Sequence, residues 1–114
     1  MSDINTLNPL FEALANDHRR NIVYTLGLQP RSISQLAAQQ SLSLPAIHKH
    51  IAVLESAGLI QRKKSGRTNF LALNKARLGS LQRWVMQYQT YWGNQEETLE
   101  NYVARIEREE QSTR

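Results

Sequence analysis

The chain has 114 residues and a mass of 13.1 kDa, enough for one domain with its own core but not for two. It has no cysteine, which excludes disulfides, thiolate metal sites and cysteine nucleophiles. The net charge of +4 is unevenly placed: residues 1–75 hold nine Lys and Arg against four Asp and Glu, whereas residues 76–114 hold five against six. The first part is therefore the candidate for binding an anionic partner.

The first expected helix is amphipathic. Its apolar side chains, which repeat at steps of three and four residues, are Leu7, Leu10, Phe11 and Leu14. A helix buries such a stripe, here either in the core of the domain or against a second copy of the chain. A second helix should follow, capped by Asn16 or Asp17 and ended by Gly27 and Pro30.

Two short helices separated by a three-residue turn come next. Ser32 is expected to cap the first, over residues 33–40. Ser43 is expected to cap the second, which carries Pro45 in its first turn and ends before Gly58. This arrangement predicts a helix-turn-helix, in which the second helix enters the major groove of DNA.

The second of these helices has an apolar face and a polar face. Its apolar side chains are Ile47, Ile51 and Leu54. The candidates for contact with the groove lie away from them and are Ser43, Leu44, Pro45, His48 and Lys49. The candidates for phosphate contact are Ser32, Ser34 and His50. For His50 a structural role is favoured, and because it lies about 200° round the helix from His48, the two cannot chelate one metal.

A β-hairpin is expected after this helix. Residues 59–64 and 67–73 are compatible with strands and flank Ser65 and Gly66, which suit the turn. The hairpin is rich in cations and has no acid, and its candidate DNA contacts are Arg62, Lys63, Lys64, Arg67 and Thr68. A capped helix followed by a basic hairpin suits a protein that reads a groove and grips phosphates. The alternative is a hairpin tip that only aids solubility.

A longer helical region begins at Asn74. Its apolar seam, interrupted only by Gln95, consists of Leu78, Leu81, Val85, Tyr88, Trp92, Leu99, Tyr102 and Ile106. Such a seam would leave a large exposed patch unless it packs on the domain or on a second copy, and a homodimer is favoured. The candidate dimerisation residues are Leu7, Leu10, Phe11, Leu81, Val85, Tyr88, Trp92 and Leu99. Gly93 and Asn94 can interrupt the helix.

Two segments of the chain resemble a known family. The run PAIHKHIAVLESAGLI, residues 45–60, resembles the recognition-helix signature of the ArsR-type winged helix-turn-helix repressors. The run FEALANDHRRNIV, residues 11–23, is similar to a segment near the start of that family. The resemblance implies a mainly α (α+β) fold, a winged helix-turn-helix with a two-stranded wing. We expect this core in residues 1–75. From the apolar seam and the polar end of the chain, we expect a helical dimerisation extension in residues 76–110 and a disordered tail in residues 111–114.

These observations predict a sequence-specific regulator that binds double-stranded DNA, most simply a homodimeric repressor reading an inverted repeat. Two alternatives stay open. One is a winged-helix module for protein–protein assembly. The other is a regulator controlled by a small organic effector near the C-terminal helix, in a pocket lined by Trp84, Tyr88, Tyr91 and Trp92.

Enzymatic, metal-dependent and membrane functions are not expected. Signatures of hydrolases, P-loop proteins, dinucleotide enzymes and zinc proteases are absent from the sequence, and no cofactor is implied. Because it has no cysteine, the chain departs from the metal sensors of the ArsR-type family, and metal sensing is not expected. No apolar run has the length of a membrane span. Asp3 and Asn5 stand where a signal peptide would be basic and then apolar, so a cytoplasmic location is expected.

Overall fold

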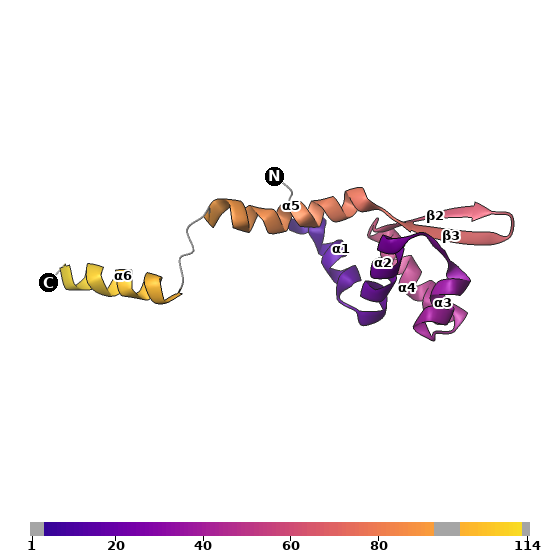
Figure 1. Ribbon diagram of the computed structural model, residues 1–114, viewed down its shortest axis with the longest axis horizontal. Coiled ribbons are helices and arrows are strands. Elements are labelled where there is room, and N and C mark those ends of the chain that lie inside the picture. The colour runs from indigo at the N-terminus through magenta and orange to yellow at the C-terminus, as the bar shows by residue number, and fades with distance from the viewer. Residues whose placement is uncertain (1–3, 93–98, 113–114) are drawn as a thin grey trace. The chain divides into compact units, whose positions relative to one another are not determined.

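The computed structural model describes residues 4–92 and 99–112, with the side chains of residues 6–88 and 99–112. By its internal contacts the chain divides into two compact units, Met1–Gln82 and Arg83–Arg114. The first unit combines helices with a small antiparallel sheet, and its hairpin projects beyond the helices (Figure 1). This architecture confirms the predicted winged helix-turn-helix.

Of the four complete helices described in the first unit, the second, third and fourth begin where the sequence places their caps. The four are α1 (Ile4–Leu14), α2 (Asp17–Leu28), α3 (Ile33–Gln40) and α4 (Leu44–Ser56). Asn16 is the cap of α2, because its side-chain oxygen accepts a hydrogen bond from the Arg19 amide at 3.1 Å. Ser32 and Ser43 cap α3 and α4, as predicted. Ser41 ends α3 in the left-handed conformation, with φ of 56°, and so turns the chain sharply into α4.

Three strands form the sheet. They are β1 (Arg31–Ser32), β2 (Ile60–Ser65) and β3 (Thr68–Leu73), in the antiparallel order β1-β3-β2. The predicted hairpin is confirmed, and Gly66 in its turn has φ of 62°, a conformation that glycine adopts without strain. Strand β1 was not predicted, because two residues are too short to carry a period. Its pairing with β3 ties the beginning of α3 to the base of the hairpin.

The core of the first unit lies between helices α1 to α4 and the sheet. Its completely buried large side chains are Leu7, Leu10, Ile22, Leu36, Ile47, Ile51, Leu54, Leu59 and Leu71. Leu7 and Leu10 are each 0% exposed, so within this chain they lie in the core, one of the two positions that the sequence left open for the first helix. Since α1 packs on α2 and α4, its apolar stripe belongs to the core of one chain. Phe11, which is 37% exposed, is the one predicted α1 interface residue that still reaches the surface.

Helix α5 (Lys75–Trp92) starts directly after Asn74, as predicted, and its first turns are fixed to the first unit. The Asn74 side-chain amide donates to the Gly58 carbonyl at 2.9 Å. Arg77 donates to the carbonyls of Ala57 at 3.2 Å and Thr6 at 3.1 Å. These bonds join the start of α5 to the ends of two other helices.

The second unit contains the rest of α5 and helix α6 (Leu99–Ser112). Within α6, Leu99, Tyr102 and Val103 are all exposed. Helix α6 continues two residues into the predicted disordered tail, and residues 113–114 lie outside the described part. The predicted break at Gly93 and Asn94 and the seam position Gln95 also lie outside it. No helix in the described ranges is long and apolar enough to cross a membrane.

Candidate nucleic-acid interface

The polar face of α4 is presented to solvent by the packing of its other face. Ile47, Ile51 and Leu54 are completely buried. All five predicted groove residues are consequently exposed, namely Ser43, Leu44, Pro45, His48 and Lys49. Between them they offer imidazole, ammonium and hydroxyl donors and the apolar Leu44 side chain, which is 52% exposed. Donors and an apolar group are the chemistry that base edges in the major groove require.

Three parts of the first unit meet at one pocket of about 200 Å³. Its lining consists of Ser32, Ile33, Ser34, Leu44, His48, Arg67, Thr68 and Asn69. The start of α3, the start of α4 and the end of the wing thus share one surface. Six of these eight residues were predicted as DNA contacts from three separate stretches of sequence. The fold brings them together.

Asn69 is a residue of this pocket that the sequence analysis missed. It lies on β3, two residues before the buried Leu71, and its partner across the hairpin is Lys64. A side-chain amide can both donate and accept, which suits contact with a base or a phosphate. The alternation of side chains along β3 was the available signal, because it places Asn69 on the same face as Leu71.

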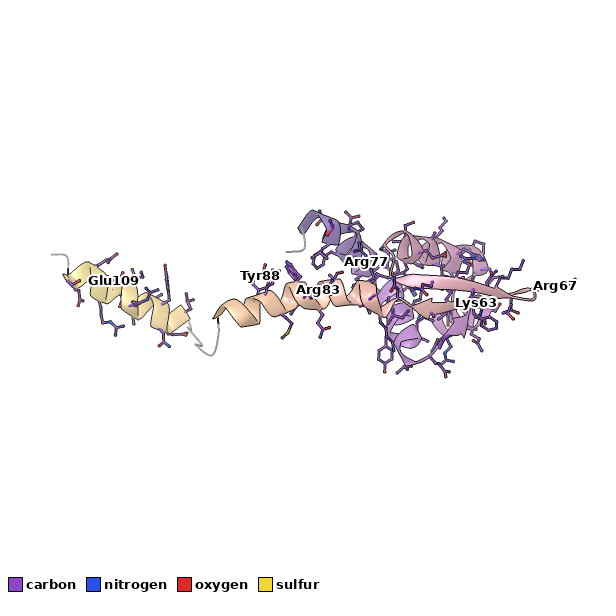
Figure 2. The ribbon with its side chains drawn as sticks, turned by 90° about the horizontal axis from the view of Figure 1, so that it is seen from above. Lys63, Arg67, Arg77, Arg83, Tyr88 and Glu109 are labelled. Atoms are coloured by element: carbon purple, nitrogen blue, oxygen red, sulfur yellow. The ribbon has the colours of Figure 1, made fainter. Side chains whose placement is uncertain are left out.

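The wing cations do not all face one way. Successive residues of a strand point to opposite faces, and residues paired across a hairpin share a face. Arg62 and Lys64 therefore lie on one face of β2, with Lys63, the partner of Phe70, on the other. Figure 2 shows Lys63 along the hairpin and Arg67 at its tip. The predicted wing cations therefore form three groups, namely Arg62 with Lys64 on one face, Lys63 on the other, and Arg67 at the tip.

Arg62 is bonded to a side chain of α4 rather than free for phosphate. Its Nε and Nη2 donate to the two carboxylate oxygens of Glu55 on α4, at 3.2 and 2.7 Å. The hydrogen bond to Glu55 is the main reason why the pKa of Arg62 is raised. Burial opposes this rise, and the charge of Glu55 adds a smaller rise. The pair links β2 to α4 and turns the Arg62 face of the wing toward that helix.

The capping serines can serve two partners. The Ser32 hydroxyl accepts from the Gln35 amide at 3.2 Å, while the Gln35 side chain accepts from the Ser32 amide at 2.9 Å, a complete capping box. The Ser43 hydroxyl accepts from the Ala46 amide at 3.3 Å. A hydroxyl that accepts a bond keeps its own proton to donate. Capping and contact with a phosphate are therefore compatible at both positions.

His50 lies at the junction of α2 and α4, away from the polar face of α4. It is half-buried, Nη1 of Arg19 lies 3.3 Å from its Nδ1, and the ring centroids of His18 and His50 are 5.4 Å apart. Burial, followed by the charges of Arg19 and His18, lowers the pKa of His50 below the ordinary 6.5. These contacts favour the structural role for His50 over contact with phosphate.

The two arginines of α2 are tied to the end of α1. Arg19 donates to the carbonyls of Ala13 at 2.6 Å and Glu12 at 3.2 Å. Arg20 donates to the Leu14 carbonyl at 2.8 Å and forms an ion pair with Asp17. Because the last carbonyls of a helix lack partners within it, these guanidinium groups complete the end of α1.

The predicted interface residues beyond the first helix are surface groups where the structure describes them. Val85 is 49% exposed and Tyr88 52%, while Leu81 is half-buried. The side chain of Trp92 lies outside the described residues. Trp84 and Tyr88 of the suggested effector pocket meet edge to face at 5.2 Å, but the side chains of Tyr91 and Trp92 also lie outside the described part. Across the described residues, no group of three or more His, Asp or Glu could hold a metal ion.

Comparison with known proteins identifies the family. The helix-turn-helix domain family matches residues 14–62. The HTH-type transcriptional regulator Rv2034 of Mycobacterium tuberculosis is 31% identical over 81 residues, which are 71% of this chain and 76% of the relative. The uncharacterized HTH-type transcriptional regulator MJ0229 of Methanocaldococcus jannaschii is 42% identical over 50 residues, 44% of this chain. That match spans only about half of the MJ0229 protein, 53%.

A solved structure extends the likeness over most of the chain. The crystal structure of the ArsR family transcriptional regulator RHA00566 superposes with a TM-score of 0.74 and 32% identity, over 82% of this chain and 97% of that one. These similar proteins are transcriptional regulators rather than enzymes, in agreement with the prediction that the chain is not an enzyme. The chain belongs to the ArsR family of winged helix-turn-helix transcriptional regulators.

Proposed function

We propose that the chain is a homodimeric repressor that binds an imperfect inverted repeat in double-stranded DNA. The observation that carries this proposal is the pocket where the starts of α3 and α4 meet the wing. Its polar side chains come from the three parts of a winged helix that can approach one DNA duplex at once. While bound, the repressor would block RNA polymerase from the same stretch of DNA.

Within this proposal, the two parts of the interface do different work. His48 and Lys49 on α4 donate to base acceptors in the major groove, and Leu44 packs on a thymine methyl group. Lys63, Lys64 and Arg67 on the wing neutralise phosphates and supply affinity that is independent of sequence. Ser32 and Ser34, at the start of α3, add uncharged contacts to the backbone.

The proposed dimer is supported by apolar side chains at the surface of the second unit. The exposed ones are Val85, Met86, Tyr88, Leu99, Tyr102 and Val103. Apolar surface of this kind gains free energy when it is buried against a second copy. Two recognition helices related by a twofold axis then read half-sites about 34 Å apart, one turn of DNA, or a multiple of it.

Binding to DNA across a salt series tests this proposal. Fragments of the DNA upstream of the chain's own gene are compared with unrelated fragments of equal length. If the dimer neutralises roughly eight phosphates, log K should fall against log salt with a slope of about −7. One fragment should stay bound at a salt concentration that strips the others. Equal binding to every fragment would contradict sequence-specific regulation, and no binding at low salt would favour a module for protein assembly.

A reporter gene behind the preferred fragment tests the direction of regulation. Expression of the chain should lower reporter output, and the variant with Arg62, Lys63, Lys64 and Arg67 all changed to Ala should restore it. A rise in output on expression would show an activator instead.

A further inference from the structure

We propose that His50 is a positioning residue that seats the recognition helix on α2 only while its imidazole is neutral, so that binding to the preferred DNA weakens under mild acidity. This inference rests on the proposed function, because it concerns how α4 is held for DNA. It follows from the groups that surround His50.

The contact with Arg19 dictates which form of His50 the fold accepts. A guanidinium group has only donors and stays charged at all relevant pH values. His50 Nδ1, 3.3 Å from Nη1 of Arg19, must therefore be the acceptor, which requires Nδ1 to carry no proton. A proton on this nitrogen abolishes the hydrogen bond and sets two cations against each other.

Arg19 cannot move away from this conflict without breaking other bonds. Its Nε and Nη2 are held by the carbonyls of Ala13 and Glu12 at the end of α1. The same side chain thus joins α1, α2 and α4. The group that gives way on protonation is His50, and α4 moves with it.

The other neighbours add to the repulsion rather than relieve it. His18, also on α2, has its ring 5.4 Å from that of His50, and its Nδ1 donates to Gln40 Oε1 of α3 at 3.0 Å. His18 and Arg19 are the two groups whose charges act on His50. Gln40 on α3 is neutral, and Ala46 and Leu54, one turn away on α4, carry no charge. The carboxylates of Glu12 on α1 and Asp17 on α2 are not among the groups that shift the pKa of His50, so neither compensates a charge on it.

The sign of the pH effect follows from the lowered pKa. Burial first, then Arg19 and His18, hold the pKa of His50 below 6.5 in the folded chain. At pH values near these two pKa values, the folded state therefore binds fewer protons than the unfolded state. Its stabilisation is fully present above about pH 6.5 and is lost as the pH falls through the lower pKa of the folded state.

Specific and unspecific DNA binding should respond differently. Added positive charge near DNA favours phosphate contact with any sequence. A displaced α4, by contrast, loses the base contacts that distinguish one sequence from another. The ratio of affinities for preferred and unrelated DNA is therefore the informative quantity.

The test measures this ratio at pH 7.5, 6.5 and 5.5 at constant ionic strength, together with urea unfolding of the full chain. We expect the wild-type ratio to fall between pH 7.5 and 5.5 by several-fold but less than about tenfold, because one proton on a group whose pKa lies below 6.5 cannot change binding by more than this over that range. His50→Asn keeps an acceptor oxygen near the position of Nδ1 but cannot be protonated, so its ratio should stay flat. His48→Gln removes the imidazole on the outer face of α4. It will change the ratio at every pH, because His48 is a proposed base contact, but its ratio should still fall between pH 7.5 and 5.5.

Three outcomes would overturn the proposal: a constant wild-type ratio, a pH-dependent ratio in His50→Asn, or a flat one in His48→Gln. If His50→Asn fails to fold, the ring signals of wild-type His50 in NMR decide, since His50 must titrate below its ordinary pKa of 6.5 over the pH range in which specificity is lost. If no fragment is preferred at pH 7.5, the proposed function has failed. The pH dependence of the wild-type urea midpoint, compared with that of His50→Asn, then decides whether neutral His50 holds α4.

Discussion

Arg62 illustrates how the surroundings of a single residue decide its role. In the sequence, Arg62 and Arg67 are equivalent as cations of the hairpin. In the structure, however, the guanidinium group of Arg62 is bonded to both carboxylate oxygens of Glu55. The two side chains are 35% and 31% exposed, so solvent screens much of their attraction. Arg62 therefore has a partner within the chain that competes with phosphate, whereas Arg67 lines the shared pocket.

Single alanine substitutions at these two arginines separate the roles. Arg67→Ala should reduce the salt slope of DNA binding by about 0.9 for each phosphate contact that is lost. Arg62→Ala removes the same charge but should change the slope less, and it should lower the free energy of unfolding by less than about 1 kcal/mol. Fluorescence anisotropy across a salt series gives the slopes. Equal slope changes in both variants would show that Arg62 contacts phosphate despite Glu55.

At the scale of elements, the helix-turn-helix depends on how two short helices begin. Helix α3 has only eight residues, too few to be stable by itself. Its capping box and its sharp turn at Ser41 fix both of its ends. The pairing of β1 with β3 then holds the start of α3 beside the hairpin. The surface offered to DNA thus depends on caps as much as on the contact residues.

Alanine substitutions at Ser32 and Ser34 distinguish capping from contact. Ser32→Ala should lower the free energy of unfolding by about 1 kcal/mol, because the Gln35 amide loses its acceptor. Ser34→Ala, an exposed change in the same turn, should leave the unfolding free energy within about 0.5 kcal/mol. Urea denaturation measures both. If Ser34→Ala weakens DNA binding at unchanged stability, a contact at the start of α3 is supported, whereas an unchanged affinity removes Ser34 from the interface.

At the scale of the whole molecule, the apolar side chains fall into two groups with different expected partners. The core side chains of the first unit, including Leu10, are buried within one chain, although Tyr24 and Leu28 of the same unit are 70% and 67% exposed. The apolar side chains of the second unit remain at the surface, with Leu99 73% exposed. Apolar surface on a small protein favours association. The two groups therefore predict different consequences of substitution.

Changes in each group should separate stability from association. Replacing both Val85 and Leu99 with Glu should give monomers that stay folded, because charge is unfavourable in a buried apolar interface. Leu10→Ala should instead lower the free energy of unfolding by about 2–5 kcal/mol, through the cavity it leaves in the core. Sedimentation reports the first effect and urea denaturation the second. A Val85 and Leu99 double variant that still sediments as a dimer would move the interface elsewhere, with Phe11 as the next candidate.

The sequence by itself determined the elements whose signals are local. Caps such as Ser43 act over three residues, and the glycine turn of the hairpin over two, so the helices of the winged fold and its wing could be placed without a structure. The polar face of α4 followed from the period of its apolar residues. The family resemblance depended on the same segments.

The tertiary structure alone decided which distant groups meet. Periodicity shows that Leu7 and Leu10 must be buried but not against what, and only the packing of α1 assigns them to the core. Arg19 and His50 are 31 positions apart, and Arg77 lies 71 positions from its acceptor Thr6. Strand β1 exists because β3 pairs with it, and Arg62 is engaged because α4 brings Glu55 within reach. Contacts of this kind arise from the fold as a whole, since nothing in the neighbouring sequence encodes them.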